Sequence, residues 1–310
     1  MKKNIEIIIP VLNEYESLDE LIKRLNKVVI ELEKNKYIVD ITFVDDGSEK
    51  KFKDLLKRYS KQEKHIKVIY LTRNFGHQAA LRAGIDNSNS DAIVMMDGDL
   101  QDPPELIAEM VNQWGKGFDV VNAVRNKRKG GSPIKKIIYK LFYIIFSRSV
   151  DFSSTRDSGD FRLISKWIAD EIKEIKEHNL FLRGYIDWLG GKKTTVSYVR
   201  DPRFGGKPKY GFSQLYKLAM NGLVSLTDFF PTLLIRVLVI SFFAVMSIFA
   251  WVSYNVIFNF EILVKGWSSV ILTLMISLLI QLFGFTFITF YLKKILEQTS
   301  GLKNYQIKKD

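Results

Sequence analysis

Five short apolar runs between residues 5 and 124 alternate with stretches that have a helical pattern. In residues 17–33, for example, apolar side chains recur on one helical face. Strands this apolar that alternate with helices predict an α/β fold, in which helices cover both faces of a mostly parallel sheet. Pro10 is expected to end the first strand. The five runs are residues 5–9, 39–44, 66–71, 92–96 and 120–124.

Polar, loop-forming residues follow four of these runs. Because ligands in open α/β sheets bind beyond the carboxyl ends of the strands, the four segments are predicted to form one site. The segment DDGS is typical either of an ordinary Asx turn or of hydrogen bonds to a base and a ribose. The four segments are residues 10–14 (PVLNE), 45–48 (DDGS), 72–78 (TRNFGHQ) and 95–105 (MMDGDLQDPPE).

Asp97 and Asp99 are separated by Gly98 and directly follow the fourth apolar run. A turn at Gly98 lets both carboxylates approach one point. Mg²⁺ and Mn²⁺ prefer oxygen ligands and are often held by one or two carboxylates together with substrate phosphates. The alternative is a turn with two solvated aspartates, and the spacing alone favours neither interpretation.

Two neighbouring polar residues are expected to have structural roles. Asp102 precedes Pro103 and Pro104, which is the order expected of a helix N-cap followed by the first helical turn. His77 stands alone and is assigned no chemistry.

Two stretches near the carboxyl end, residues 237–257 and 270–292, contain no charged side chain. A helix of roughly 20 apolar residues crosses a hydrocarbon core of ~30 Å. The stretches therefore predict a transmembrane hairpin with helices at 235–257 and 269–292, and the alternative is a pair of helices buried in a soluble core. The predicted parts are a domain of residues 1–230, a hairpin of residues 231–295 and a basic tail of residues 296–310.

Basic residues flank the predicted hairpin, whereas its connecting loop carries only Glu261 and Lys265. The positive-inside rule places the large domain and both termini in the cytoplasm, with the chain as a multi-pass protein of the inner (cytoplasmic) membrane. Membrane lipid is then a partner, and a homo-oligomer is expected. The flanking basic residues are Arg236, Lys293, Lys294, Lys303, Lys308 and Lys309.

The formal net charge of +12 suits several anionic partners: nucleic acid, anionic lipid or a phosphorylated substrate. No nucleic-acid-binding motif accompanies it, so no nucleic acid is expected, and anionic lipid or phosphorylated substrates are preferred. Residues 134–150 (IKKIIYKLFYIIFSRSV) predict an amphipathic helix that lies on a membrane surface or packs on its own domain. The absence of cysteine excludes disulfides and cysteine-ligated zinc.

Several motifs, in this order along the chain, resemble those of family 2 glycosyltransferases, which have the GT-A (Rossmann-like) fold. The chain is most similar to the polyprenyl-phosphate glycosyltransferases, a group that contains bactoprenol glucosyltransferases and dolichol-phosphate mannose synthases. A two-helix membrane hairpin at the carboxyl end is also characteristic of this group. The motifs are IPVLNE, VDDGS, LTRNFGHQAA, MDGDLQDPPE, SGDFRL at 158–163 and RDPRFGGKPKY at 200–210.

This resemblance implies roles for individual residues. Asp97 and Asp99 would hold Mg²⁺ or Mn²⁺ against the diphosphate of the donor. Asp160 would orient the acceptor or the sugar, with base catalysis as the alternative, and it is counted with Asp99 as catalytic. The predicted nucleotide-sugar-binding residues are Pro10, Leu12, Asn13, Glu14, Asp46, Ser48, Asp97, Gln101 and Arg125. The predicted acceptor-phosphate-binding residues are Arg200, Arg203, Lys207 and Lys209.

The implied activity is an inverting glycosyl transfer from a nucleotide sugar, UDP-glucose, to polyprenyl (undecaprenyl) phosphate at the cytoplasmic membrane face. Alternatives are a mannosyl- or aminoarabinosyl-type transferase and, from another class, a non-enzymatic sugar-nucleotide-binding scaffold or transporter subunit. A processive polysaccharide synthase is disfavoured because no Q-x-x-R-W motif is present. A dehydrogenase is disfavoured because no G-x-G-x-x-G motif follows the first strand.

Overall fold

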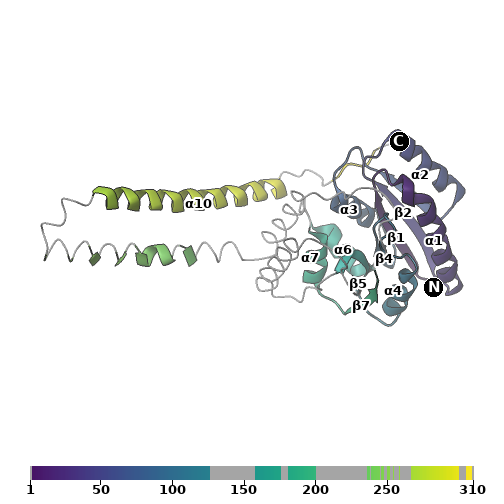
Figure 1. Cartoon of the computed structure of the whole chain (residues 1–310). Coiled ribbons are helices and arrows are strands. Elements are labelled where there is room, and N and C mark those ends of the chain that lie inside the picture. Colours follow the sequence, from purple (N-terminus) through teal and green to yellow (C-terminus); the bar gives the residue numbers. More distant parts are fainter. Residues whose placement is uncertain are drawn as a thin grey trace. The chain divides into compact units, whose positions relative to one another are not determined.

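The computed structural model describes residues 2–125, 158–175, 181–199, 267–299 and 305–308, together with scattered helical residues between 236 and 258. The chain divides into two compact units (Figure 1). One consists of Met1–Leu226 with Lys303–Asp310, and the other of Thr227–Leu302. The predicted helix at 134–150 and the basic segment at 200–210 lie outside the described residues.

The first unit is built on a seven-stranded sheet with the strand order β3-β2-β1-β4-β6-β5-β7. Among the seven described strands, β6 is antiparallel to both β4 and β5, and the other strand pairs are parallel. The predicted α/β fold with a mostly parallel sheet is therefore confirmed. The strands are β1 (Asn4–Val11), β2 (Ile38–Asp45), β3 (Ile66–Tyr70), β4 (Ala92–Met95), β5 (Val120–Arg125), β6 (Ser158–Ser165) and β7 (Lys193–Tyr198).

Both faces of the sheet are buried, as the uninterrupted apolar runs predict. Along β1, Ile7 and Ile9 face a core formed with α1, α2 and α4, whereas Ile8 faces a second core formed with α3, α6 and α7. Figure 1 shows the helices on the two sides of the strands. These helices are α1 (Tyr15–Lys34), α2 (Lys50–Gln62), α3 (His77–Asn87), α4 (Leu106–Gly115), α6 (Lys166–Glu174) and α7 (Leu182–Leu189).

Pro10 does not end the first strand, contrary to the expectation from sequence. β1 continues to Val11, and Pro10 pairs with Val44 of β2. On its other side β1 pairs with β4 only through Ile5–Ile8. Because Pro10 lies beyond the end of that second ladder, its missing N–H removes no ladder hydrogen bond there.

Gly84 of α3 lies directly against Ile8 of β1. A Cβ atom at this position would lie 2.3 Å from Cγ2 of Ile8, far inside van der Waals contact. We expect Gly84→Ala to lower the free energy of unfolding by about 1–3 kcal/mol, because overpacking forces the helix from the strand. Urea unfolding measures the change.

Gly115→Ala is the matched control for this substitution. It also lies in a helix, but its added Cβ would meet only the Tyr37 hydroxyl at 3.5 Å, an ordinary contact. Alanine has the higher helix propensity, so this variant should be as stable as the wild type or slightly more stable. Equal stability of both variants would contradict the close packing of α3 on β1.

The second unit contains α10 (Trp267–Thr299), a helix of 33 residues. In the part of the chain that the structure describes, no helix has the length and apolar character needed to cross a membrane. The predicted hairpin at 235–257 and 269–292 is therefore not confirmed.

Candidate active site at the carboxyl edge of the sheet

The loops after β1 and β2 are joined by hydrogen bonds through Asn13 and Ser48. The Asn13 backbone N–H donates to Ser48 Oγ over 3.0 Å, and Asn13 Oδ1 accepts the Glu49 backbone N–H over 2.9 Å. Asn13 has a φ of 53°, a left-handed conformation that asparagine adopts more readily than most residues. Two of the predicted segments, 10–14 and 45–48, are thus brought together.

Asp46 connects this pair of loops to the segment that follows β3. Its carboxylate accepts the backbone N–H groups of Phe75 over 2.7 Å and Gly76 over 3.0 Å. Burial raises the pKa of Asp46, and these two bonds oppose that rise. A Cβ on the adjacent Gly47 would lie 2.5 Å from the backbone of Arg73 and Asn74. Asp46, predicted to contact the nucleoside, therefore also fixes the loop 72–76.

His77, at the first position of α3, lies between two carboxylates from distant parts of the chain. Its Nε2 is 3.0 Å from Asp97 Oδ1 and 3.6 Å from Asp160 Oδ2. His77, to which the sequence assigned no chemistry, thus contacts two carboxylates of the candidate site. Its position in the polar segment after β3 was the available signal, but only the fold brings β4, α3 and β6 to one point.

Asp160 on β6 is held by partners that the sequence did not reveal. Its Oδ1 is 3.0 Å from Nη2 of Arg183 on α7, and its Oδ2 accepts a bond from Gln78 Nε2 over 3.3 Å. Burial raises the pKa of Asp160, but Arg183, His77 and Arg162 together lower it to about 2. The carboxylate is therefore ionised at any working pH.

Asp97 has the opposite electrostatic surroundings. Burial raises the pKa of Asp97 to about 6, with Asp160, Asp102 and Asp99 adding to the rise and His77 opposing it. Asp99 is buried, and its Oδ1 accepts the backbone N–H of Gln101 over 3.1 Å. A partly buried and a buried carboxylate in excess negative charge are hard oxygen donors of the kind that fit a divalent cation. Among the described residues, no three His, Asp or Glu side chains are grouped so as to hold a metal.

The sequence context of Asp102 predicted a helix N-cap, but Asp102 does not cap α4. The helix begins at Leu106 with Glu105 at the N-cap position, and Asp102 is fully buried. Its carboxylate accepts a hydrogen bond from the Tyr198 hydroxyl and lies 3.6 Å from Nη2 of Arg125. Arg125 Nε also donates to the Tyr198 oxygen over 3.1 Å. Arg125, predicted to bind the donor, thus ties β5 to β7 and to the loop after β4.

We expect Tyr198→Phe to lower the free energy of unfolding by roughly 1–3 kcal/mol, because a buried carboxylate loses a hydrogen-bond donor. Thermal or urea unfolding measures the change. Tyr59→Phe is the control, since it removes an exposed tyrosine–aspartate bond of 2.6 Å to Asp19 and should cost less than about 0.5 kcal/mol. Equal costs for the two variants would contradict the importance of the buried bond.

The other predicted residues fall into two groups. Pro10 lies in β1, Leu12 and Glu14 lie in the loop between β1 and α1, and Gln101 directly follows the turn 97–100. These four are at the same edge of the sheet as Asp97. The four acceptor-side residues, Arg200, Arg203, Lys207 and Lys209, lie outside the described residues.

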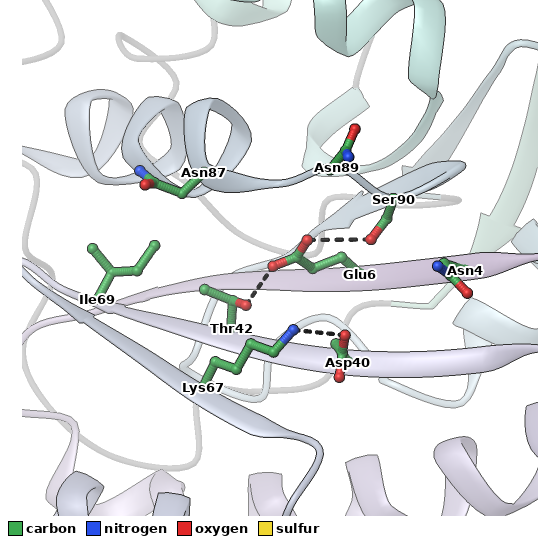
Figure 2. A pocket seen from close by; sticks show the side chains of 9 residues that line it. All are labelled: Asn4, Glu6, Asp40, Thr42, Lys67, Ile69, Asn87, Asn89 and Ser90. Carbon is green, nitrogen blue, oxygen red and sulfur yellow. Dashed lines mark hydrogen bonds and ion pairs between the residues drawn. The ribbon is translucent and has the colours of Figure 1, made fainter.

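A separate polar pocket of about 420 Å³ lies toward the amino ends of the strands, beyond the end of α3 (Figure 2). Glu6 is buried there and accepts hydrogen bonds from Thr42 Oγ1 over 2.5 Å and Ser90 Oγ over 3.3 Å. Lys67 Nζ donates to Asp40 over 2.7 Å. The carboxylates of this pocket are thus already engaged by neighbouring side chains, and it lies away from the carboxyl-edge aspartates.

The sheet, with aspartates from β4 and β6 gathered beyond its carboxyl edge, defines an α/β enzyme of the GT-A type. Residues 6–173 match the family model described as "Glycosyl transferase family 2". The chain belongs to glycosyl transferase family 2, and it is a glycosyltransferase.

Similar proteins extend over much or all of the chain. The uncharacterized glycosyltransferase YkcC of Bacillus subtilis (strain 168) is 42% identical over 219 residues, which are 71% of this chain and 67% of YkcC. The prophage bactoprenol glucosyl transferase homolog of Escherichia coli (strain K12) is 32% identical over 307 residues, 98% of each chain. Among solved structures, the mannosyltransferase PcManGT from Pyrobaculum calidifontis in complex with GDP-Man and Mn²⁺ has a TM-score of 0.48 and 14% identity, with 72% of this chain and 63% of that one covered.

Proposed function

We propose that the protein transfers a hexose, glucose from UDP-glucose, to polyprenyl (undecaprenyl) phosphate with inversion at the anomeric carbon. The observation that carries this proposal is the similarity to the Escherichia coli bactoprenol glucosyl transferase homolog over 98% of both chains. The convergence of Asp97, Asp160 and His77 at the carboxyl edge of the sheet supplies a site for the reaction.

Asp97 and Asp99 are the residues proposed to hold Mg²⁺ or Mn²⁺. The raised pKa of Asp97 supports this assignment, because a nearby cation would relieve the repulsion among Asp97 and the neighbouring aspartates. A bound divalent cation supplies Lewis-acid stabilisation of the negative charge that develops on the departing nucleoside diphosphate. Gln101 is assigned to the same side of the site.

Asp160 is proposed to orient the sugar rather than to act as a base. A carboxylate with a pKa of about 2 is a weak base, and a phosphate acceptor is already an anionic nucleophile. The negative charge on Asp160 repels that phosphate. The Asp160 carboxylate can, in contrast, accept hydrogen bonds from sugar hydroxyl groups. Arg183 and Gln78 hold the carboxylate in place for this role.

The donor site is proposed to lie across the joined loops after β1 and β2. Arg125 is also proposed to bind the donor. The acceptor phosphate is assigned to cationic side chains that follow β7, because arginine suits bidentate phosphate recognition. The proposed donor residues in these loops are Pro10, Leu12, Asn13, Glu14, Asp46 and Ser48, and the proposed acceptor residues are Arg200, Arg203, Lys207 and Lys209.

The chain is proposed to be held at the inner membrane by helices at 235–257 and 269–292, with membrane lipid as a partner and the helix at 134–150 on the surface. Exposed apolar side chains of α10, such as Leu274 and Phe285, support a lipid environment.

Residues 305–308 bond to the edge of β3, so the tail and the catalytic domain share one side of any membrane crossed between them. That requirement supports an even number of crossings. Self-association into a homo-oligomer is part of the same proposal.

The test is a transfer assay with the purified full-length protein, Mg²⁺, polyprenyl phosphate and a panel of radiolabelled nucleotide sugars. We expect label from UDP-glucose in the lipid fraction and no transfer in the presence of EDTA. Transfer from a GDP-mannose or aminoarabinose donor instead would replace glucose by that sugar. If no donor labels the lipid while a nucleotide sugar still binds, the non-enzymatic scaffold is the better explanation.

A further inference from the structure

The last residues of the chain return to the edge of the catalytic sheet. β3 is the outermost strand on that side, and Ile307 forms an antiparallel bridge with Leu71 just after it. The Thr72 N–H donates to the Gln306 carbonyl over 2.9 Å, and the Lys308 N–H donates to the Tyr70 carbonyl over 2.8 Å. Residues 305–308, the C-terminal tail, therefore add a short strand to an otherwise open edge.

Side chains of the C-terminal tail attach it to α3 as well. Tyr305 and Ile307 pack against the core beneath this helix. The Tyr305 hydroxyl donates to Asp86 Oδ2 over 2.9 Å, and Arg82 Nε holds the other oxygen, Oδ1, over 2.6 Å. Burial and the neighbouring Asp86 raise the pKa of Tyr305, so the phenol keeps its proton. Asp86 lies in the last turn of α3, whereas Leu71 and Thr72 precede the helix.

The C-terminal tail thus contacts the chain on both sides of the segment that carries site residues. Between these two attachments lie the loop 72–76, whose Phe75 and Gly76 amides bond to Asp46, and the first turn of α3. In that turn His77 approaches Asp97 and Asp160. The contacts are continuous from the tail to the carboxylates.

We propose that the C-terminal tail is a positioning strap that holds the loop 72–76 and α3 in the arrangement required for donor binding. The strap acts through Asp46 and His77 and touches no substrate itself. Its role in donor binding rests on the proposed function, whereas its effect on the loop does not. The tail follows the segment proposed to enter the membrane, so the arrangement of the donor loop depends on a part of the chain made after that segment.

The test compares the full-length protein with a truncated variant in which a stop codon replaces Tyr305. Hydrogen exchange should become about tenfold faster at the Phe75 and Gly76 amides, because loss of the edge pairing frees the loop to open. Exchange at β1 and β4 should stay unchanged. The donor KM should rise about tenfold with a smaller change in kcat. Truncation lowers the fraction of protein whose loop is in the donor-binding conformation, whereas the conformation of the bound complex stays the same.

Matched variants separate positioning from general loss of stability. A stop codon at Lys309 removes only the last two residues and leaves residues 305–308 in place, so this variant should behave like the wild type. Tyr305→Phe removes one hydroxyl and should give a smaller effect of the same kind. A peptide of residues 301–310, added to the truncated protein, should restore slow exchange at Phe75 and Gly76, and a scrambled peptide should not.

Two results would contradict the proposed positioning role of the C-terminal tail. Unchanged exchange at Phe75 and Gly76 after truncation would show that the tail does not hold the loop. Equally faster exchange throughout the sheet would show a general stabilising role instead. Because exchange requires no substrate, these outcomes are distinct from a failure of the proposed glucosyl transfer, which would appear as an inactive wild-type protein.

Discussion

Asp97→Asn should lower the rate of glycosyl transfer by at least about 100-fold while the protein remains folded. The substitution keeps the shape of the side chain but removes the charge that is proposed to attract a divalent cation. Asp97 lies directly after β4, with His77 Nε2 at 3.0 Å and three other aspartates raising its pKa. In the cation-free protein, loss of this disfavoured charge should leave Tm unchanged or raise it. Initial rates at saturating donor and acceptor measure the effect.

The thermal shift on adding Mg²⁺ or Mn²⁺ gives a readout that does not depend on turnover. A ligand that binds the folded state raises Tm, so the wild type should be stabilised and Asp97→Asn should not. Asp54→Asn is the matched control, because Asp54 is exposed on α2; it should keep both activity and the metal-induced shift. Full activity in Asp97→Asn would exclude the metal assignment.

Asp160→Asn should lower kcat by roughly 100-fold with a smaller change in the donor KM, because a charged hydrogen-bond acceptor for the sugar is lost. It also leaves Arg183 without its carboxylate partner at 3.0 Å. If Asp160 orients rather than deprotonates, the wild-type kcat should show no acid limb from this residue above pH about 4, since its pKa is about 2. A limb near neutral pH that disappears in Asp160→Asn would support base catalysis instead.

The stability of the same variant follows from the sign of the pKa shift. A carboxyl group whose pKa falls from 3.8 unfolded to about 2 folded stabilises the protein above pH about 4. That contribution is lost as the pH falls toward 2. The Tm advantage of the wild type over Asp160→Asn should therefore shrink in this range. Asp170→Asn is the control, because its ion pair with Lys173 is half exposed and should matter little at any pH.

The strand ends observed in the structure show how far the apolar runs could predict the fold. The run at 92–96 became β4 (Ala92–Met95), and the run at 39–44 became β2 (Ile38–Asp45). A strand buried on both faces must be apolar at nearly every position, so its limits are visible locally. The prediction that Pro10 ends the first strand was wrong, because the cost of a proline depends on whether a neighbouring strand needs its N–H. That need is a property of the tertiary structure.

The roles of His77 and Asp102 could not be predicted for the same kind of reason. Asp102 has the local context of a helix cap, but its main partner, Tyr198, lies 96 residues away. Gln78 and Asp160, which share a hydrogen bond, are 82 residues apart. Local spacing reports only helix and strand neighbours, whereas these contacts arise where separate strands end at one edge.

The sequence by itself determined the first five strands, up to Arg125, and the polar segments that follow four of them, because burial and turn formation act on adjacent residues. It also placed Asp97 and Asp99 at a strand end. Only the tertiary structure decided that His77 joins Asp97 to Asp160, that Asp102 is buried with Tyr198, and that the C-terminal tail closes the edge of β3. The physical reason is that the pairing and electrostatics of buried polar groups depend on which distant elements meet them.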